Sequence, residues 1–223
     1  MKVAALIFTM FLAAVSAAGQ VAALQNDSPE VKSFLAEIKA GEILKTANYR
    51  SVWTKEFVAE RSKEAKLQER MVSEVIQPNK ARSVVEQFSD TPSREEIIRD
   101  GKAFYIRQGD KPWQRFNGDG GRSVQFVQMP YRIQFRFLPS VEFEGGKADF
   151  YEYVTIRTSN KSSKKDAVVV RYVITTRSWF STDGKILKKI EETTVEGRVE
   201  MVRETTTYEY DPKDLKIEAP AIK

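Results

Sequence analysis

The sequence contains no cysteine and no histidine. Without cysteine the chain can form no disulfide, use no thiol in catalysis and carry no lipid on an N-terminal cysteine. Without histidine it lacks the most common general base and metal ligand, so a Ser-His-Asp site is excluded. With 223 residues, of which 41% are hydrophobic, the chain is still long enough to be stabilised by a core alone, as a single domain.

Long hydrophobic runs are also missing, except at the start of the chain. Lys2 precedes an apolar stretch at 3–15, and small residues follow it. This order is typical of a secretory signal peptide, with cleavage after Ala17 or Ala18. The alternative, an uncleaved membrane anchor, fits less well because the stretch is short for a bilayer. We therefore expect a signal peptide at 1–18, a flexible leader at 19–27 and one domain at 28–223.

Neither sign of charge dominates, since 36 basic residues stand against 31 acidic ones. The basic residues are spread along the chain, which favours a solvated surface over a nucleic-acid interface. Acidic neighbours such as Glu95 and Glu96 lie in alternating segments, where they would point to opposite faces and could not act as a catalytic pair. No calcium-loop spacing is present. We expect no enzymatic activity, no cofactor and no metal site.

One helix is predicted near the start of the domain. Ser28 is a suitable N-cap, and a proline and a glutamate follow it in the first turn. Apolar residues then recur at helical spacing, among them Phe34, Leu35 and Ile38. The pattern predicts a helix over 28–46.

From Tyr49 onward the apolar period changes to two, which indicates strands. Asp100-Gly101 is a hairpin signal, and the stretch 122–144, with its two prolines, is interpreted as an edge strand. In all, nine or ten antiparallel strands joined by short turns are expected. The predicted fold class is α+β and predominantly antiparallel β, with a curved sheet or open barrel wrapped around the N-terminal helix.

Large apolar side chains gather on one face of these predicted strands. Such a face is either a filled core, which is the more common outcome, or a cavity left partly open for a ligand, as curled antiparallel sheets can leave. Methionine in the lining would suit variable acyl chains. The candidate lining residues are Phe34, Leu35, Ile38, Trp53, Phe57, Met71, Val75, Phe104, Ile106 and Phe135.

Three stretches carry a likeness to a known family: the helix running into Tyr49–Trp53, the segment Ile97–Ile106 with its Asp-Gly turn, and the end of the chain from Thr205 to Pro220. In the order of its elements the chain resembles the LolA-like family of bacterial lipoprotein and lipid carriers. The resemblance implies an open barrel around helices that carries lipid. Because there is no lipobox cysteine, it implies a soluble carrier rather than an anchored receptor.

The leading hypothesis is an exported, soluble protein that binds a lipid or acyl chain in its apolar concavity, as a periplasmic carrier. It would be a secreted protein if the host is not a Gram-negative bacterium. The expected partners are the acyl chains of lipids or lipoproteins and a membrane-associated protein, and not nucleic acid. The alternative is a non-enzymatic sensor or protein-interaction domain of the same shape. A carboxylate-dependent hydrolase is the weakest candidate.

Overall fold

The structure is a computed structural model that describes residues 28–59, 64–117, 132–162 and 167–221. The side chains of 117, 159–162 and 167–169 lie outside this description. The signal peptide and leader predicted at 1–27 also lie outside the described residues, as does part of the stretch 122–144.

Helix α2 (Pro29–Thr46) begins where the sequence predicts. The Ser28 hydroxyl accepts a hydrogen bond from the Val31 amide at 3.2 Å, and Pro29 occupies the first helical position. Each feature satisfies or removes an amide that would otherwise lack a partner at the helix start. No helix in the described ranges is both long enough and apolar enough to cross a membrane.

All the described strands belong to one antiparallel sheet. The strands are β1 (Tyr49–Val58), β2 (Ala65–Ile76), β3 (Lys80–Gln87), β4 (Ser93–Asp100), β5 (Ala103–Gln108), β6 (Gln114–Asn117), β7 (Arg132–Phe143), β8 (Gly146–Ser162), β9 (Ala167–Ser181), β10 (Ile186–Val195) and β11 (Met201–Tyr210). Their order across the 11-stranded sheet is β6-β5-β4-β3-β2-β1-β11-β10-β9-β8-β7. Two meanders, β1 to β6 and β7 to β11, are thus joined by the pairing of the first strand with the last.

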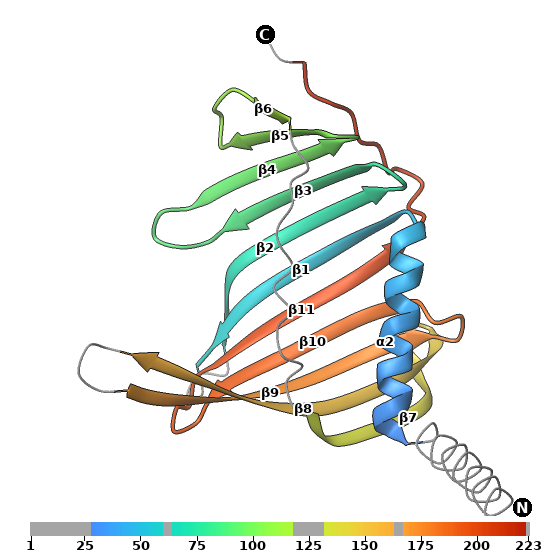
Figure 1. The fold of residues 1–223 in the computed structure, drawn as a ribbon, viewed down its shortest axis with the longest axis vertical. Helices are drawn as coiled ribbons and strands as arrows, with labels where there is room; N and C mark the ends of the chain where they lie inside the picture. The colour runs from blue at the N-terminus through green and yellow to red at the C-terminus, as the bar shows by residue number, and fades with distance from the viewer. Residues whose placement is uncertain (1–27, 60–63, 118–131, 163–166, 222–223) are drawn as a thin grey trace, which may run out of the picture.

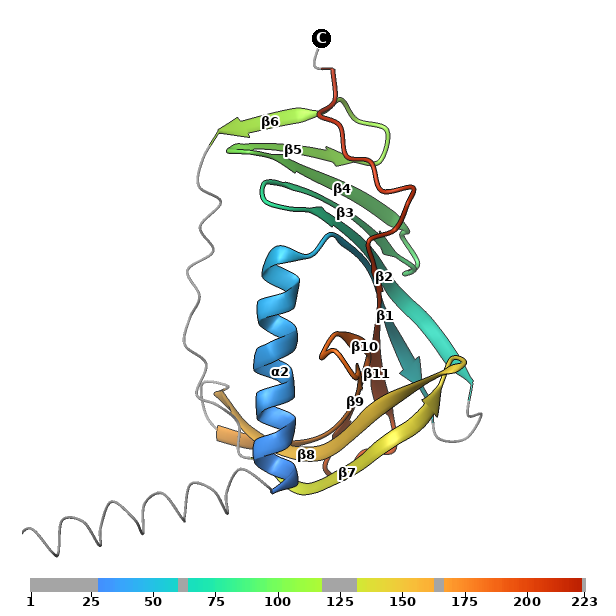
Figure 2. The same ribbon diagram turned by 90° about the vertical axis from the view of Figure 1, so that its right-hand side faces the viewer.

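The sheet is strongly curved, and α2 lies in its hollow (Figure 1, Figure 2). Strands β6 and β7 are the two edges, so the sheet stays open rather than closing into a barrel. The predicted class, predominantly antiparallel β curved around one N-terminal helix, is confirmed. The edge position predicted for the proline-containing strand is that of β7, and Gly101, with φ +62°, forms the predicted turn between β4 and β5.

A buried cluster fixes the helix against the concave face. Ala40, which is 2% exposed, packs with Tyr151, Phe180 and Ile186 of β8 to β10. Ser33 is also buried, and its hydroxyl donates to the Glu30 carbonyl at 2.8 Å. The helix residues buried most completely are therefore small, and Ala36 and Leu44 pack at the margin of the same cluster.

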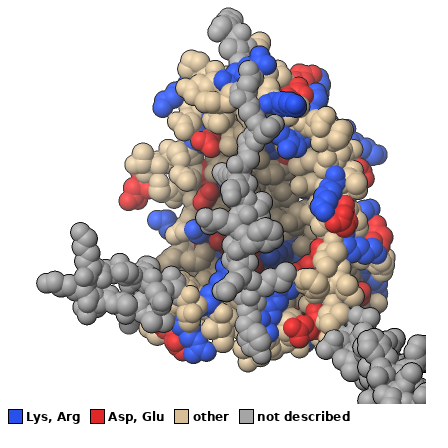
Figure 3. Space-filling view, viewed as in Figure 1, with Lys and Arg blue, Asp and Glu red and all other residues tan. Residues whose placement is uncertain are grey.

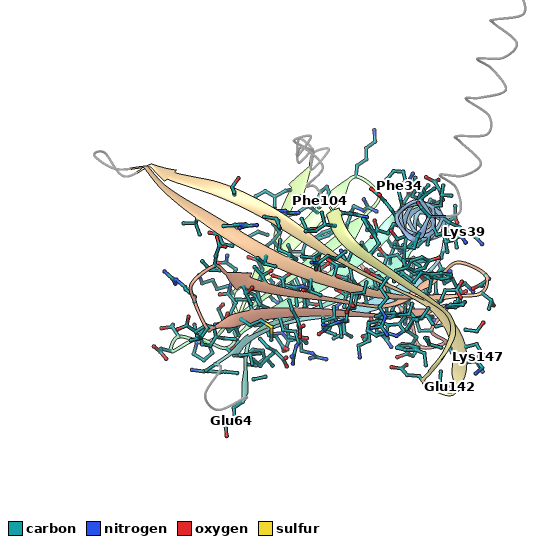
Figure 4. All side chains as sticks on the ribbon, turned by 90° about the horizontal axis from the view of Figure 1, so that it is seen from below. Phe34, Lys39, Glu64, Phe104, Glu142 and Lys147 are labelled. Atoms are coloured by element: carbon teal, nitrogen blue, oxygen red, sulfur yellow. The ribbon has the colours of Figure 1, made fainter. Side chains whose placement is uncertain are left out.

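Phe34, Leu35 and Ile38, the helix residues predicted to face the sheet, do not belong to this cluster. They are 41%, 50% and 47% exposed. Viewed from below, Phe34 and Lys39 lie on different sides of the helix, and the sheet lies beneath it (Figure 4). Helical periodicity locates an apolar stripe, but it does not show which side of the helix packs against the neighbouring element.

The convex face carries a second buried cluster. Ile98 of β4 and Tyr105 of β5 pack with Ile217, which belongs to the C-terminal segment after β11. In Figure 2 this segment runs along the outer side of the sheet, away from α2. The two buried clusters therefore lie on opposite faces of the same sheet.

Candidate binding site on the concave face

Strand register shows which residues share the concave face with α2. One continuous row crosses the sheet through directly paired residues: Glu95, Val85, Met71, Trp53, Thr206, Lys189, Ser178, Tyr151 and Phe137. Its Tyr151 end packs under the helix. Since residues of one row point to the same face, Trp53 and Met71 also face the hollow.

Four of the predicted lining residues come together on β1 and β2. Trp53 pairs with Met71, and Val75 pairs with Tyr49, which lies on the same face of β1. Phe57 shares this face as well, opposite Val202 of β11. All four predicted side chains are half-buried and belong to neither buried cluster.

Phe104 and Ile106 extend this apolar face to the far side of the sheet. Phe104 pairs with Arg99, and Ile106 pairs with Ile97. Ile106 also lines a pocket of about 240 Å³ that it shares with Gln114 and Phe116 of β6. The pocket is smaller than the roughly 300–1,000 Å³ of a typical ligand site, so by itself it would hold part of a ligand.

Phe135 lies at the opposite end of the face, beside the helix. Its ring centroid is 5.7 Å from that of Tyr153, whose hydroxyl donates to Glu37 of α2 at 2.9 Å. Burial, followed by the nearby Glu37 carboxylate, raises the pKa of Tyr153 well above its usual range. Arg132 also binds Glu37, at 2.9 Å. Because these groups bind one another, this end of the face fixes the helix.

The remaining predicted residues, Phe34, Leu35 and Ile38, are not brought to this face by direct packing. They form an exposed apolar stripe on α2. The structure thus joins Trp53, Phe57, Met71, Val75, Phe104 and Ile106 into one surface, and it separates the helix stripe from that surface.

Sequence reasoning missed several polar residues on the concave face. Ser73 and Ser83 pair across β2 and β3, and their hydroxyl oxygens are 3.1 Å apart. Tyr210 donates to the Ile186 carbonyl at 3.2 Å, and burial, followed by Tyr208, raises its pKa to about 12. The same strand alternation that selected the aromatic residues could have identified these positions.

Sequence reasoning also missed Arg99, although the hairpin pattern around it carried a signal. A two-residue Asp100-Gly101 loop would pair Arg99 with Lys102, which shares a strand face with Phe104. In the structure the loop lies one residue later, and Arg99 pairs with Phe104 itself. That pairing places the arginine on the face already predicted to be apolar.

Seen from the helix side, the molecular surface is hollowed, and the hollow is lined mainly by side chains that are neither acidic nor basic (Figure 3). Lys and Arg side chains gather mostly around its rim. Among the described residues no group of three or more acidic side chains is placed to hold a metal ion. The hollow therefore has an apolar floor with polar groups among its residues, such as the hydrogen-bonded Ser73 and Ser83.

No protein family model matches the sequence, and no curated protein is similar to it. Among solved structures, the chain is similar to a domain from Vibrio parahaemolyticus whose name proposes a role in outer membrane lipoprotein sorting. The likeness covers 73% of this chain and 85% of that one, at 11% identity and a TM-score of 0.23. At these values the likeness carries no argument about function.

Proposed function

We propose that the protein is a non-enzymatic carrier that binds a lipid or acyl chain on the concave face of its sheet. Export to the periplasm, through the signal peptide predicted at 1–18, belongs to the same proposal. The observation that carries it is the half-buried apolar floor of the hollow, represented by Trp53, Met71 and Phe104.

The apolar floor is not needed to build the core. The most buried apolar side chains lie elsewhere, under α2 around Phe180 and on the convex face around Ile217. Contiguous apolar surface that is not fully buried in the core generally marks a binding site. An acyl chain placed on this floor would gain about 0.8 kcal/mol for each methylene removed from water.

Polar groups on the floor are compatible with an apolar ligand. The Ser73 and Ser83 hydroxyls bond to each other, so an acyl chain that covers them deprives only one of the two hydroxyl protons of water. A hydroxyl left without a partner would instead oppose binding.

Uptake of a fluorescent fatty acid tests the proposal. The wild type should bind the probe saturably, and Met71→Gln, which puts an amide on the floor, should weaken binding roughly tenfold by removing about 1–1.5 kcal/mol of apolar contact. Val72→Gln is the matched control. Val72 is the next residue of β2, is also half-buried and points to the convex face, so its replacement should leave affinity unchanged. Absence of saturable uptake by the wild type would refute the carrier function.

A second candidate function, binding of a protein partner, is favoured by the stripe of Phe34, Leu35 and Ile38. These three side chains are 41–50% exposed on one side of α2. Exposed apolar stripes of this kind suit a groove on another protein. A variant with all three replaced by serine should keep fatty-acid uptake and lose capture of a membrane-associated partner. Unchanged capture would exclude the stripe as the contact.

A further inference from the structure

Arg99 differs from the other half-buried arginines. Each of the others in the described part of the chain lies 2.6 to 3.2 Å from a carboxylate: Arg50, Arg70, Arg82, Arg107, Arg132, Arg177 and Arg203. Arg99 is equally half-buried, yet it forms no ion pair with any residue that the structure describes, and its Nε is shielded from solvent without a hydrogen-bond partner.

The surroundings of Arg99 are apolar and lie on the floor of the hollow. In one row across the sheet, Arg99 pairs with Phe104 on β5 and with Ala81 on β3, and Ala81 pairs with Val75 on β2. Tyr49 of β1 pairs with Val75 and is therefore the next residue of the row.

An unpartnered guanidinium in such surroundings is costly. Arginine stays protonated at any physiological pH, and a buried donor without an acceptor loses its hydrogen bonds to water and gains none within the protein. An anion with two oxygens would remove this cost, because the planar guanidinium binds carboxylate and phosphate groups through two parallel hydrogen bonds. The partner missing from the protein is therefore of the chemical type that a ligand could supply.

Tyr49 offers a second donor in the same row as Arg99. Burial raises the pKa of the Tyr49 phenol, and the smaller effect of Arg99 lowers it. The phenol therefore stays protonated at neutral pH and can donate a hydrogen bond to an anionic oxygen.

We propose that Arg99, assisted by Tyr49, binds the anionic head group of the amphiphile whose chain lies on the concave face. The head group is a carboxylate or a phosphate ester, and neutral amphiphiles are discriminated against. The inference rests on the proposed carrier function and adds to it the class of ligand.

Three amphiphiles of equal chain length test the inference: dodecanoate, dodecyl phosphate and dodecanol, each displacing the fluorescent fatty acid. The wild type should bind at least one of the two anions more tightly than dodecanol, by roughly tenfold or more, the typical effect of a hydrogen bond to a charged group. Whichever anion binds more tightly identifies the head group. Arg99→Met should bring that anion to the level of dodecanol and leave dodecanol unchanged. Arg99→Lys, which keeps the charge but not the fork of donors, should retain part of the preference.

Arg94→Met is the matched control. Arg94 lies on the same strand but on the other face, opposite Glu86, and is exposed. Its replacement should therefore leave the affinities for the anions and for dodecanol unchanged. Thermal unfolding of each variant establishes that it is folded, and Arg99→Gln replaces Arg99→Met if the latter does not fold. A wild type that binds all three amphiphiles equally would overturn the role of Arg99 and leave the carrier function standing. A preference for anions that persists in Arg99→Met would overturn it as well. Failure to bind any of the three would refute the carrier function itself.

Discussion

At the scale of single residues, Glu96 shows how the convex face is held together. Its side chain is 5% exposed and accepts from Arg82 Nε and from Arg107 Nη2, each at 2.7 Å. Burial raises the pKa of this carboxyl, but the hydrogen bonds from Arg107 and Arg82 outweigh it and hold the pKa below the ordinary 4.5. The ion pairs of Glu96 with Arg82 and Arg107 thus stabilise the fold while Glu96 is ionised.

Glu96→Gln should lower the free energy of unfolding by about 3 kcal/mol at neutral pH, because it removes the carboxylate that binds both guanidinium groups; Arg82 keeps only the more distant Glu74, at 3.6 Å. A carboxyl with a lowered pKa contributes stability above its unfolded pKa and loses that contribution as the pH falls through the folded value. The difference between variant and wild type should therefore shrink below about pH 4.5. Urea unfolding of variant and wild type over this pH range measures the difference in stability, and a difference that stays constant would contradict the prediction. Glu95→Gln, on the other face of the same strand, should change stability by under about 0.5 kcal/mol.

Trp53 and Phe180 separate the floor of the hollow from the core. Phe180 is 2% exposed within the cluster under α2, whereas Trp53 is half-buried outside it. Phe180→Ala should cost about 3–5 kcal/mol, and Trp53→Ala about 1–2 kcal/mol, because part of its ring is already in contact with solvent. Chemical denaturation gives both values. Equal losses would mean that the floor is a packed core.

At the scale of elements, the helix residues buried most deeply against the sheet are small. Ala40→Leu should destabilise the protein by about 1–3 kcal/mol, because the leucine would be forced against Tyr151 and Phe180. Ile38→Ser, on the exposed stripe, should change stability by no more than about 0.5 kcal/mol. Thermal unfolding of the two variants measures the contrast. A larger loss for Ile38→Ser than for Ala40→Leu would mean that the opposite side of α2 faces the sheet.

The helix and the hairpins could be predicted from the sequence, because their signals are local. Ser28 with its following proline sets the helix start, and Asp100-Gly101 sets a turn, each within a few residues. The rotation of α2 could not be predicted in this way. It depends on Tyr151 and Phe180, which lie more than a hundred positions along the chain and fill the space that large helix residues would otherwise occupy.

At the scale of the whole molecule, the pairing of β1 with β11 could not be predicted from the sequence either. Alternation gives each strand two faces but does not say which strands are neighbours. The pairing brings Trp53 beside Thr206 and so joins the apolar floor of one meander to the helix-covered half of the other. Two ladders of alternating Arg and Glu cross the convex side of this junction, one through Arg50 and Glu74 and the other through Glu56 and Arg203.

The two faces of the sheet should therefore be separable by mutation. Ile97 and Ile98 are neighbours on β4, but Ile97 points to the floor of the hollow, and Ile98 packs on the convex side with Tyr105 and Ile217. Ile217→Ala should cost about 2–4 kcal/mol of stability, because it removes buried contacts, and should leave fatty-acid affinity unchanged in the molecules that remain folded.

Ile97→Ala should act in the opposite way. It removes part of the half-buried floor, so it should cost less stability than Ile217→Ala and should weaken fatty-acid binding by roughly tenfold, the equivalent of about two methylene contacts. Urea titration and probe titration on the same preparations give both quantities for each variant. If Ile217→Ala impaired binding as much as Ile97→Ala did, the ligand would not be confined to the concave face, because a mutation on the convex side has no contact through which to weaken it.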